Sequence, residues 1–436
     1  MKKVLVITYY WPPAGGPGVQ RILNFVKYLP EFGWQPVVLT VKNGEFPEID
    51  YSFLEEVPEE LSVYRADTIE PYPLYRMLTG RSSKDKIPTY VLTERKSKNL
   101  GSLLATFFRG NLFIPDAKIG WIPAAVRKGL KIIRQDNVQL IYSTSPPQTV
   151  NLIAKIISKK SGVKWVADLR DPWTDIFYYH QLKRMKWAKK YDRYLEKSTL
   201  NSAKSIITVS SSLTQLFKTK IPNQYHVIPN GFESSKFPSV KKKSYSQFFK
   251  VIHTGHLAGN QNPETLWKSI NILIHKEGNF KESIALEFYG KVHDDIIKSI
   301  KFYELNDYTQ FFEYQSHNKI LEVLTEASLL FFVIPICSYS EGILTSKLFE
   351  YLGARKPVLG IGPSQGDAAK ILSEVRAGKV CNYQDLDAVL VFLKSYFRQW
   401  KKEGVTKLSR SNKYLKYTRR NLTQILSSIF NQVIEG

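Results

Sequence analysis

The sequence is poor in cysteine, and this shortage excludes several classes of protein. Only Cys337 and Cys381 occur among 436 residues, and both stand in apolar or strand-like surroundings. A disulfide framework needs more cysteines than this, and no cluster of Cys and His has the spacing of zinc ligands. No Asp-x-Asp-type pair stands in a convincing place either. We therefore predict a reducing compartment and no zinc site.

Long hydrophobic runs are lacking as well. No stretch approaches the roughly 20 apolar residues that cross a bilayer. Two lysines and an apolar run over residues 4–8 resemble the start of a signal peptide, but the run is short and is followed by aromatic residues and prolines at 9–13. We predict a buried first strand here, and a protein that is cytoplasmic or peripheral on the inner face of the cell membrane.

Acidic residues are outnumbered, since 39 Asp and Glu stand against 62 Lys and Arg and the net charge is +23. Such an excess attracts polyanions, of which nucleic acid, anionic lipid headgroups and phosphorylated small molecules are the three plausible kinds. The basic residues are scattered along the whole chain, and no recognised nucleic-acid-binding module occurs. We therefore expect no nucleic-acid partner.

The order of strand-like and helix-like segments predicts an α/β fold. A chain of 436 residues is too long for one core, and 43% of it is hydrophobic. A polar stretch over 234–250 resembles a linker, and the strand–helix pattern restarts after it, so we predict two doubly wound domains with ligands at the carboxyl ends of their strands. Strands are predicted over residues 4–9, 35–41, 138–143, 164–168, 205–209, 250–254, 286–289, 329–334 and 357–361, and a helix over 19–32; no order is assigned to 45–115.

The segment 340–359 is the strongest candidate site. It is predicted as a loop, a helix that begins near Thr345 or Ser346, and a turn into a strand. Free amides at a helix N-terminus attract anions, and Lys347 in the first turn adds a full positive charge. Glu350 lies one turn further on the same face, where a carboxylate can accept both hydroxyls of a ribose. The alternative is a surface helix with a capping Ser and a Lys–Glu pair.

Two further candidate sites follow predicted strands in the first half. The loop 11–21 is rich in Gly and Pro, and Gly15, Gly16 and Gly18 allow close approach of a ligand to the backbone, although the spacing is not that of a dinucleotide fingerprint. A purely structural loop is the alternative. The segment 168–173 places Asp168, Arg170, Asp171 and Trp173 directly after a strand. A structural Asp–Arg pair is the alternative for Asp168 and Arg170, and Asp171 is the better functional candidate.

The segment 176–197 interleaves aromatic and aliphatic residues with Lys and Arg, and we predict a helix. Such a mixture is typical of an interfacial helix among anionic headgroups. A second apolar patch is predicted over 102–114. The alternative for both is an amphipathic helix that packs on the sheet and exposes a basic face. A ligand linked to a polyprenyl phosphate lipid would explain both features together.

The segment 340–359 resembles the donor-site helix of the family-four retaining glycosyltransferases, and its residues 346–351 are more similar to the branch that builds bacterial capsule and O-antigen repeats. Glu350 stands seven positions before Pro357, as the second Glu of that family's pattern does, and Glu341 is one residue out of the first-Glu register. Further matches are residues 228–232, 253–257, 261–264, 290–291 and 315–317. Many relatives carry an Arg and a Lys where this chain has His256 and Gln261.

This resemblance implies the GT-B fold, in which two Rossmann-like domains face a cleft. Residues 1–230 would bind the acceptor, 231–410 would bind the nucleotide-sugar donor, and the helix in 411–436 would pack back on the first domain. The implied catalytic residues are Lys347, Glu341 and Asp171, and the implied acceptor-side residues are Asp168, Arg170, Asp171 and Trp173. The implied donor-binding residues are Gly15, Gly16, Gly18, Gly255, His256, Gln261, Gly290, Thr345, Ser346, Lys347 and Glu350.

The implied function is transfer of a hexosyl group from a nucleoside diphosphate sugar, with retention and without a metal, to a lipid-linked precursor of a cell-surface polysaccharide. The sugar nucleotide is a co-substrate, so no cofactor is expected. A sugar-nucleotide epimerase of the same architecture is the first alternative, because it would bind the same donor without needing an acceptor. A nucleic-acid-binding protein, favoured only by the charge of +23, is the second, and an inactive binding module is the third.

Overall fold

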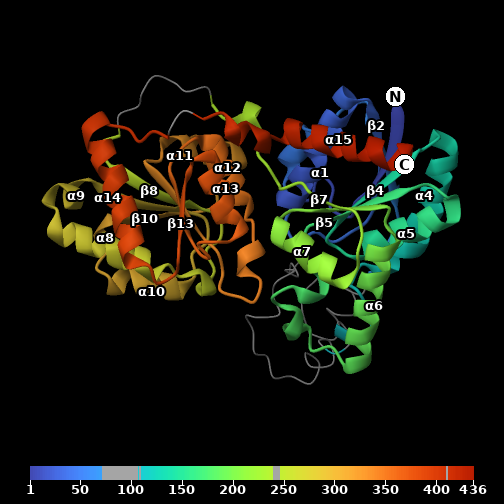
Figure 1. Cartoon of the computed structure of the whole chain (residues 1–436), viewed down its shortest axis with the longest axis horizontal. Helices are drawn as coiled ribbons and strands as arrows, with labels where there is room; N and C mark the ends of the chain where they lie inside the picture. The colour runs from blue at the N-terminus through green and yellow to red at the C-terminus, as the bar shows by residue number, and fades with distance from the viewer. Residues whose placement is uncertain (71–106, 108–109, 239–245, 409–410) are drawn as a thin grey trace. The chain divides into compact units, whose positions relative to one another are not determined.

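The computed structural model describes residues 1–70, 107, 110–238, 246–408 and 411–436. The chain forms two compact units, each built on a parallel sheet with helices packed on it (Figure 1). The first unit comprises Met1–Pro229 together with Arg420–Gly436, and the second comprises Asn230–Arg419. The prediction of two doubly wound α/β sheets is therefore confirmed.

The first unit contains a seven-stranded sheet with the order β3-β2-β1-β4-β5-β6-β7, and all neighbouring strands are parallel. Its central strands β4 and β5 are buried over their whole length because helices cover both faces, as is usual in parallel sheets. β3 lies in the stretch for which the sequence predicted no order. The strands are β1 (Lys2–Ile7), β2 (Trp34–Val41), β3 (Ser62–Ala66), β4 (Leu140–Ser145), β5 (Trp165–Leu169), β6 (Ser205–Thr208) and β7 (Tyr225–Val227).

The described helices of the first unit are α1 (Pro17–Tyr28), α4 (Ile122–Asp136), α5 (Thr149–Ser161), α6 (Lys186–Ser202), α7 (Ser211–Lys220) and α15 (Arg419–Glu435). The helix predicted over 176–197 begins only at Lys186. Before it lie the 3₁₀ turns η4 (Trp173–Asp175) and η5 (Tyr179–Leu182), and Lys183 in the left-handed region (φ 47°) ends the second turn. The predicted patch over 102–114 lies largely outside the described residues.

The last helix, α15, is part of the core of the first unit. Its apolar face contributes Leu422, Leu426 and Phe430 to the same buried cluster as residues of β1 and α1. The ring of Phe430 makes edge-on contacts with Trp34 at 5.3 Å and with Tyr142 at 5.4 Å between centroids. Along the sequence, residues 230–419 thus form one continuous unit, and the two segments of the first unit precede and follow it.

The second unit contains a six-stranded parallel sheet with the order β10-β9-β8-β11-β12-β13. Its strands are β8 (Phe249–Thr254), β9 (Ile284–Tyr289), β10 (Thr309–Phe312), β11 (Leu329–Val333), β12 (Val358–Ile361) and β13 (Gly378–Cys381). Its helices are α8 (Glu264–Lys276), α9 (Gly278–Ser283), α10 (Asp294–Phe302), α11 (His317–Glu326), α12 (Ser346–Ala354), α13 (Asp367–Val375) and α14 (Leu386–Glu403). The parallel order brings the loops after β8, β9 and β11 to one edge, where ligands of such sheets bind.

Candidate functional site

Two glycines bring the loops after β8 and β9 into direct contact in the second unit. Gly255 (φ 80°) and Gly290 (φ 122°) both adopt backbone conformations that side chains disfavour. The Gly255 amide donates to the Tyr289 carbonyl at 2.7 Å. A Cβ atom on Gly290 would lie 2.9 Å from the Gly255 carbonyl oxygen, which is too close for any side chain. Glycine is therefore required at Gly290 for this edge of the sheet to form.

Lys347 extends from α12 over the first of these loops. A Cβ atom on Gly255 would lie 3.0 Å from Lys347 Cε, and the Lys347 ammonium donates to the His256 carbonyl at 3.2 Å. Burial lowers the pKa of Lys347, and the nearby Glu350 carboxylate opposes this shift. A partly buried cation thus stands at the carboxyl edge of the sheet, where it would attract a phosphate.

The start of α12 offers backbone donors beside this cation. Thr345 is the N-cap residue, and its side chain makes no capping hydrogen bond; its hydroxyl is buried without a partner. Ser346 is the first helical residue. The first amides of a helix have no partner inside the helix, so uncapped amides are well suited to bind an anion. Thr345, Ser346 and Lys347 are therefore brought together as the sequence predicted.

Glu350 lies one turn beyond Lys347 and has a partner that the sequence did not suggest. His317 Nε2 lies 3.0 Å from Glu350 Oε1, and the two side chains are 22% and 18% exposed. A lone histidine at the start of an amphipathic helix carries no signal of such a contact, because only the packing of α11 against α12 produces it. Glu350 is thus partly exposed at the carboxyl edge of the second sheet, and its contact with His317 orients its carboxylate.

The remaining predicted donor residues of this unit have different surroundings. The side-chain amide of Gln261 accepts from Ala258 N in its own loop at 3.1 Å and donates to the Val333 carbonyl at the end of β11 at 2.8 Å. His256 is exposed, and its carbonyl is the one that contacts Lys347. Glu341 lies exposed in the 3₁₀ turn η9 (Ser340–Gly342). Of these three residues, only His256 contacts Lys347, through its backbone.

The Gly-rich loop of the first unit surrounds an arginine. Gly16 (φ 96°) is the N-cap of α1, and a Cβ atom on Gly18 would collide with the Arg170 guanidinium. Arg170 Nε donates to the Ser145 carbonyl at 2.9 Å. Gly15 donates to the Glu48 carbonyl at 3.0 Å. Gly18 therefore makes room for Arg170, and the loop and the end of β5 form one cluster.

Asp168 is fully buried and is used inside the protein. It accepts from Arg21 Nε and Nη2 at 3.0 Å each, and from Tyr142 and Thr144 at 2.8 and 2.9 Å. The structural pair considered for Asp168 and Arg170 does not form: Asp168 pairs with Arg21, and Arg170 donates to backbone carbonyls instead. Four internal donors leave the Asp168 carboxylate little capacity for a ligand.

Asp171 differs from Asp168 because it is partly accessible. Burial raises the pKa of Asp171, and the positive charge of Arg170 partly offsets this shift. Burial also lowers the pKa of Arg170. A carboxyl group with a raised pKa at a strand end is a functional-site candidate.

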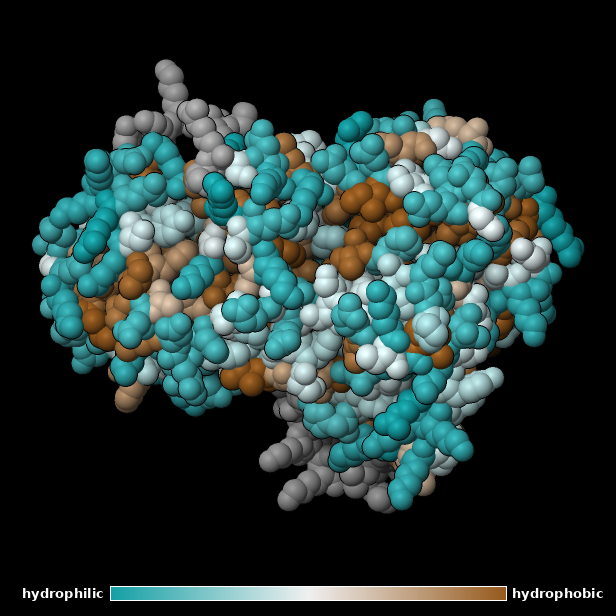
Figure 2. Space-filling model, in the orientation of Figure 1, coloured by the Kyte–Doolittle hydropathy of each residue, from teal (hydrophilic) through white to brown (hydrophobic). Residues whose placement is uncertain are grey.

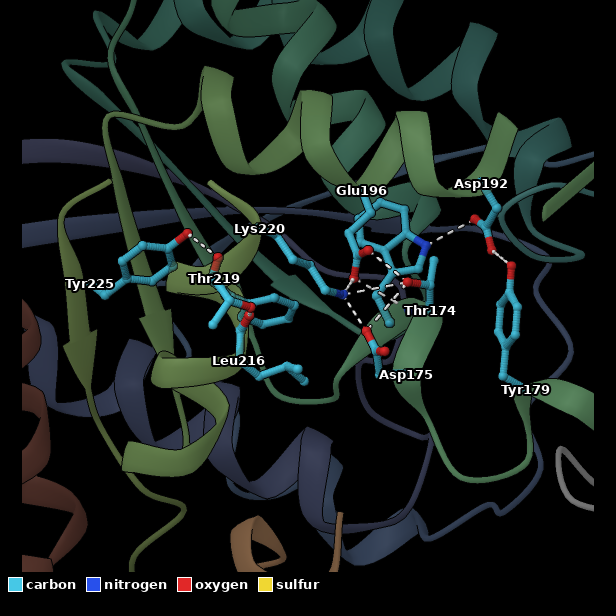
Figure 3. Close-up of polar contacts among 11 residues, drawn as sticks. Thr174, Asp175, Tyr179, Asp192, Glu196, Leu216, Thr219, Lys220 and Tyr225 are labelled. Carbon is cyan, nitrogen blue, oxygen red and sulfur yellow. Dashed lines mark hydrogen bonds and ion pairs between the residues drawn. The ribbon is translucent and has the colours of Figure 1, made fainter. Parts of the chain in front are cut away.

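The connection after Asp171 is clamped to α6, as Figure 3 shows. Trp173 is buried with a left-handed φ of 28°, and its indole donates to Asp192 at 2.9 Å. Tyr179 donates to the second oxygen of Asp192 at 2.8 Å, and Arg184 pairs with the same carboxylate. Trp173 is therefore an anchor of this connection rather than an accessible side chain.

A second clamp lies one turn further along α6 (Figure 3). Glu196 accepts from the Thr174 hydroxyl and from the Lys220 ammonium, both at 2.7 Å, and Lys220 also pairs with Asp175. Burial raises the pKa values of both Asp192 and Glu196, while their cationic partners lower them. The buried face of α6 thus fixes the segment that follows Asp171.

No group of three or more His, Cys, Asp and Glu side chains among the described residues is arranged to hold a metal ion. In the same part of the chain, no helix combines the length and the apolar character that a membrane span requires.

Residues 83–236 match the profile of a family described as Glycosyltransferase Family 4. A comparison of the sequence with curated proteins finds no match. Among solved structures, a glycosyltransferase from Rickettsia africae ESF-5 is 12% identical with a TM-score of 0.64, and the match covers 100% of this chain and 99% of the solved one. HepE from Anabaena, solved in complex with UDP, is 12% identical with a TM-score of 0.59 and coverages of 100% and 98%.

A third solved structure, assigned as a UDP-N-acetylglucosamine 2-epimerase from Listeria monocytogenes, is 12% identical with a TM-score of 0.55 and coverages of 100% and 98%. At these identities the likenesses establish the fold. Together with the two parallel sheets, they assign this chain the GT-B fold.

Proposed function

We propose that this protein is a glycosyltransferase that moves a hexosyl group from a nucleoside diphosphate sugar to a hydroxyl acceptor, with retention and without a metal. The observation that carries the proposal is the cluster at the carboxyl edge of the second sheet. Lys347 lies over Gly255, the uncapped start of α12 lies beside it, and Glu350 follows one turn later. A cation with helix amides suits a diphosphate, and a carboxylate suits ribose hydroxyls.

In the proposed reaction, the bond between the sugar C1 and the diphosphate oxygen breaks, and C1 forms a bond to the acceptor oxygen. The acceptor hydroxyl gives its proton to the Asp171 carboxylate, and the nucleoside diphosphate leaves with the bonding pair. Lys347 and the amides of α12 stabilise the negative charge that grows on the leaving diphosphate, which is usually the largest catalytic contribution of this kind. Glu341, exposed in η9, is the proposed contact of the donor sugar.

The acceptor side is proposed to be the strand end that carries Asp171. Burial raises the pKa of Asp171, which favours proton exchange with a hydroxyl. The two clamps from α6 hold the following segment in one conformation. Asp168 and Trp173 act there as internal supports, and Arg170 shapes the Gly-rich loop.

The proposed acceptor is a polyprenyl-linked precursor of a capsule or O-antigen polysaccharide, held at an anionic membrane surface. The outer face of α6 supports this part of the proposal. The only acidic residues of this helix, Asp192 and Glu196, are both buried, and its exposed residues are almost all basic or aromatic. They include Lys186, Trp187, Lys190, Tyr191, Arg193, Tyr194 and Lys197.

Such a face is complementary to anionic headgroups, because lysine and arginine bind phosphates while Trp and Tyr prefer the interface. Trp187, Tyr191 and Tyr194 are 49%, 49% and 62% exposed, and the rings of the two tyrosines stack. The surface over α6 is mostly hydrophilic in Figure 2, so the proposed contact is peripheral. We propose the inner face of the cell membrane as its location.

The test is a thermal-shift panel with UDP, GDP, ADP and dTDP, with and without their sugars. A nucleotide that binds the native state raises the melting temperature with concentration. We expect one base to stand out, and Lys347→Ala to abolish its shift. Lys301→Ala, which removes an exposed lysine at the end of α10, is the matched control and should behave as wild type. An equal shift in Lys347→Ala, or no shift with any nucleotide in wild type, would contradict the proposal.

A sugar-nucleotide epimerase is the second candidate, favoured by the shared fold of the Listeria monocytogenes structure. The two functions differ in their need for an acceptor. An epimerase would convert the sugar nucleotide alone, whereas the proposed transferase releases nucleoside diphosphate at a useful rate only when acceptor is added. Turnover of the stabilising sugar nucleotide to an isomer, followed by NMR without acceptor, would favour the epimerase.

A further inference from the structure

His317 and Glu350 form a contact between two helices at the proposed nucleotide site. The Nε2 atom of His317 lies 3.0 Å from Oε1 of Glu350. An ionised carboxylate only accepts hydrogen bonds, so Nε2 must carry a hydrogen whether the ring is neutral or charged. Because both side chains are about one-fifth exposed, the contact lies at the edge of the protein rather than in its core. A ligand therefore has access to it.

The backbone that carries His317 is fixed by its neighbours. Ser316 is the N-cap of α11, and its hydroxyl accepts from the Lys319 amide at 3.4 Å. The strand end just before it is tied to the Gly-containing loop, because Gly290 donates to the Phe312 carbonyl at 3.0 Å. The rings of Tyr289 and Phe312 stack at 4.5 Å. These contacts thus hold the start of α11, and with it His317, in place.

The contact uses only part of the acceptor capacity of Glu350. A carboxylate has about four acceptor positions on two oxygens. His317 occupies one position on Oε1, so Oε2 and the remaining position on Oε1 stay available for two hydroxyls. A free glutamate side chain loses rotamer entropy when a ligand orders it, and a partner that orders it beforehand reduces this loss.

We infer that His317 is a positioning residue that holds the Glu350 carboxylate in the orientation in which it accepts the ribose hydroxyls of the nucleotide. The inference rests on the proposed function, because it assumes that the nucleotide lies between Lys347 and Glu350. It adds a selectivity for ribose. A fixed carboxylate left without a hydroxyl partner penalises a 2′-deoxyribonucleotide more than a mobile one, which can turn to water.

The test compares UDP, GDP and ADP with their 2′-deoxy forms by calorimetric titration of the full chain. His317→Phe keeps a ring of similar size but removes the donor, whereas His317→Gln keeps a donor near the Nε2 position. We expect His317→Phe to reduce the preference for the ribose form about tenfold, the value of one hydrogen bond to a charged group. His317→Gln should retain most of the preference.

A double-mutant cycle separates this role from a purely structural one. In a Glu350→Ala background, His317→Phe should have no further effect on the affinity for the ribonucleotide, because the group that it positions is gone. Equal losses for ribose and deoxyribose forms, a loss that persists in the Glu350→Ala background, or tighter binding by His317→Phe would overturn the inference. Binding of dTDP without any of the three ribonucleotides would also overturn it. Wild type that binds neither dTDP nor any of the three ribonucleotides would instead contradict the proposed function.

Discussion

Arg21 of α1 and Asp168 at the end of β5 form a buried, two-pronged ion pair. Arg21 Nε and Nη2 each lie 3.0 Å from an oxygen of Asp168, and the two side chains are 1% and 0% exposed. The third nitrogen of the guanidinium, Nη1, donates to the Pro229 carbonyl at 2.7 Å. The pair therefore ties the first helix, the fifth strand and the last residue before Asn230 into one structure.

We predict that Asp168→Asn or Arg21→Ala destabilises the first unit by about 3–5 kcal/mol, because each leaves one buried charge without its partner. Urea unfolding followed by circular dichroism measures the loss. The matched control is Arg420→Ala, which breaks an exposed pair with Glu31 at 2.6 Å and should cost about 0–1 kcal/mol. If both substitutions lower the free energy of unfolding equally, the buried pair contributes no more to stability than the exposed one.

Gly290→Ala is predicted to disturb the proposed nucleotide site and the fold together. The new Cβ atom would lie 2.9 Å from the Gly255 carbonyl, and φ of 122° is unfavourable for alanine. We expect a loss of roughly 1–3 kcal/mol in stability and a weaker thermal shift with nucleotide. Gly278→Ala is the control, since its Cβ meets nothing within 4 Å and its stability should be unchanged or slightly raised. A Gly290→Ala variant with wild-type stability would contradict the close contact of the two loops.

His253 gives the second unit a predicted dependence on pH. Burial lowers the pKa of His253 from its usual 6.5 to about 3, and the charge of Lys347 acts in the same direction. Between these values the unfolded chain binds a proton that the native state does not bind, so stability falls as pH falls from about 6.5 to about 3. At full effect this is roughly 5 kcal/mol.

His253→Phe should remove this contribution while keeping an aromatic ring beside Phe331. The measurement is the free energy of unfolding of both proteins across this pH range, so that carboxylates common to both cancel. The stability of wild type relative to the variant should fall steadily as the pH falls from about 6.5 to about 3. A constant difference would contradict a neutral, buried His253.

The start of the helix that carries Lys347 could be predicted because its signals are local, whereas the role of this cluster in nucleotide binding stays a prediction. A capping position, a cation in the first turn and a carboxylate one turn later are fixed by the geometry of a single helix. The two sheets were predictable for a similar reason, since buried parallel strands are short apolar runs separated by turn signals. The four edge strands β3, β7, β10 and β13 were missed, because they are only partly buried and lack an apolar run.

The contacts that depend on tertiary packing were not predictable. Arg21 pairs with Asp168 across 147 positions of sequence, and Arg170, the nearer arginine, turns to backbone carbonyls instead. Gln261 stands where relatives of the resembled family carry a charged side chain, but its amide bridges its own loop and the end of β11. His317 meets Glu350 only because α11 packs against α12. No pattern along the chain distinguishes these outcomes.

The outer face of α6 is predicted to bind anionic vesicles. We expect the protein to sediment with vesicles of phosphatidylcholine and phosphatidylglycerol but not with phosphatidylcholine alone. Replacing Lys186, Lys190 and Arg193 by Gln should weaken binding by about 1 kcal/mol for each residue, and added salt should reduce the wild-type binding. Replacing Trp187, Tyr191 and Tyr194 by Ser should also weaken binding. This loss should depend less on the salt concentration, because these side chains contribute apolar area.

The control for this prediction removes exposed positive charge outside α6, and the effects are compared per residue. Lys401→Gln with Lys402→Gln removes two exposed lysines from the end of α14 in the second unit, and binding should stay at the wild-type level. If these two substitutions weaken binding as much per residue as those in α6, the attraction comes from the overall charge of +23 rather than from one face. If the α6 variants bind normally, the basic and aromatic surface of this helix has another partner, and the membrane proposal fails while the nucleotide site stands.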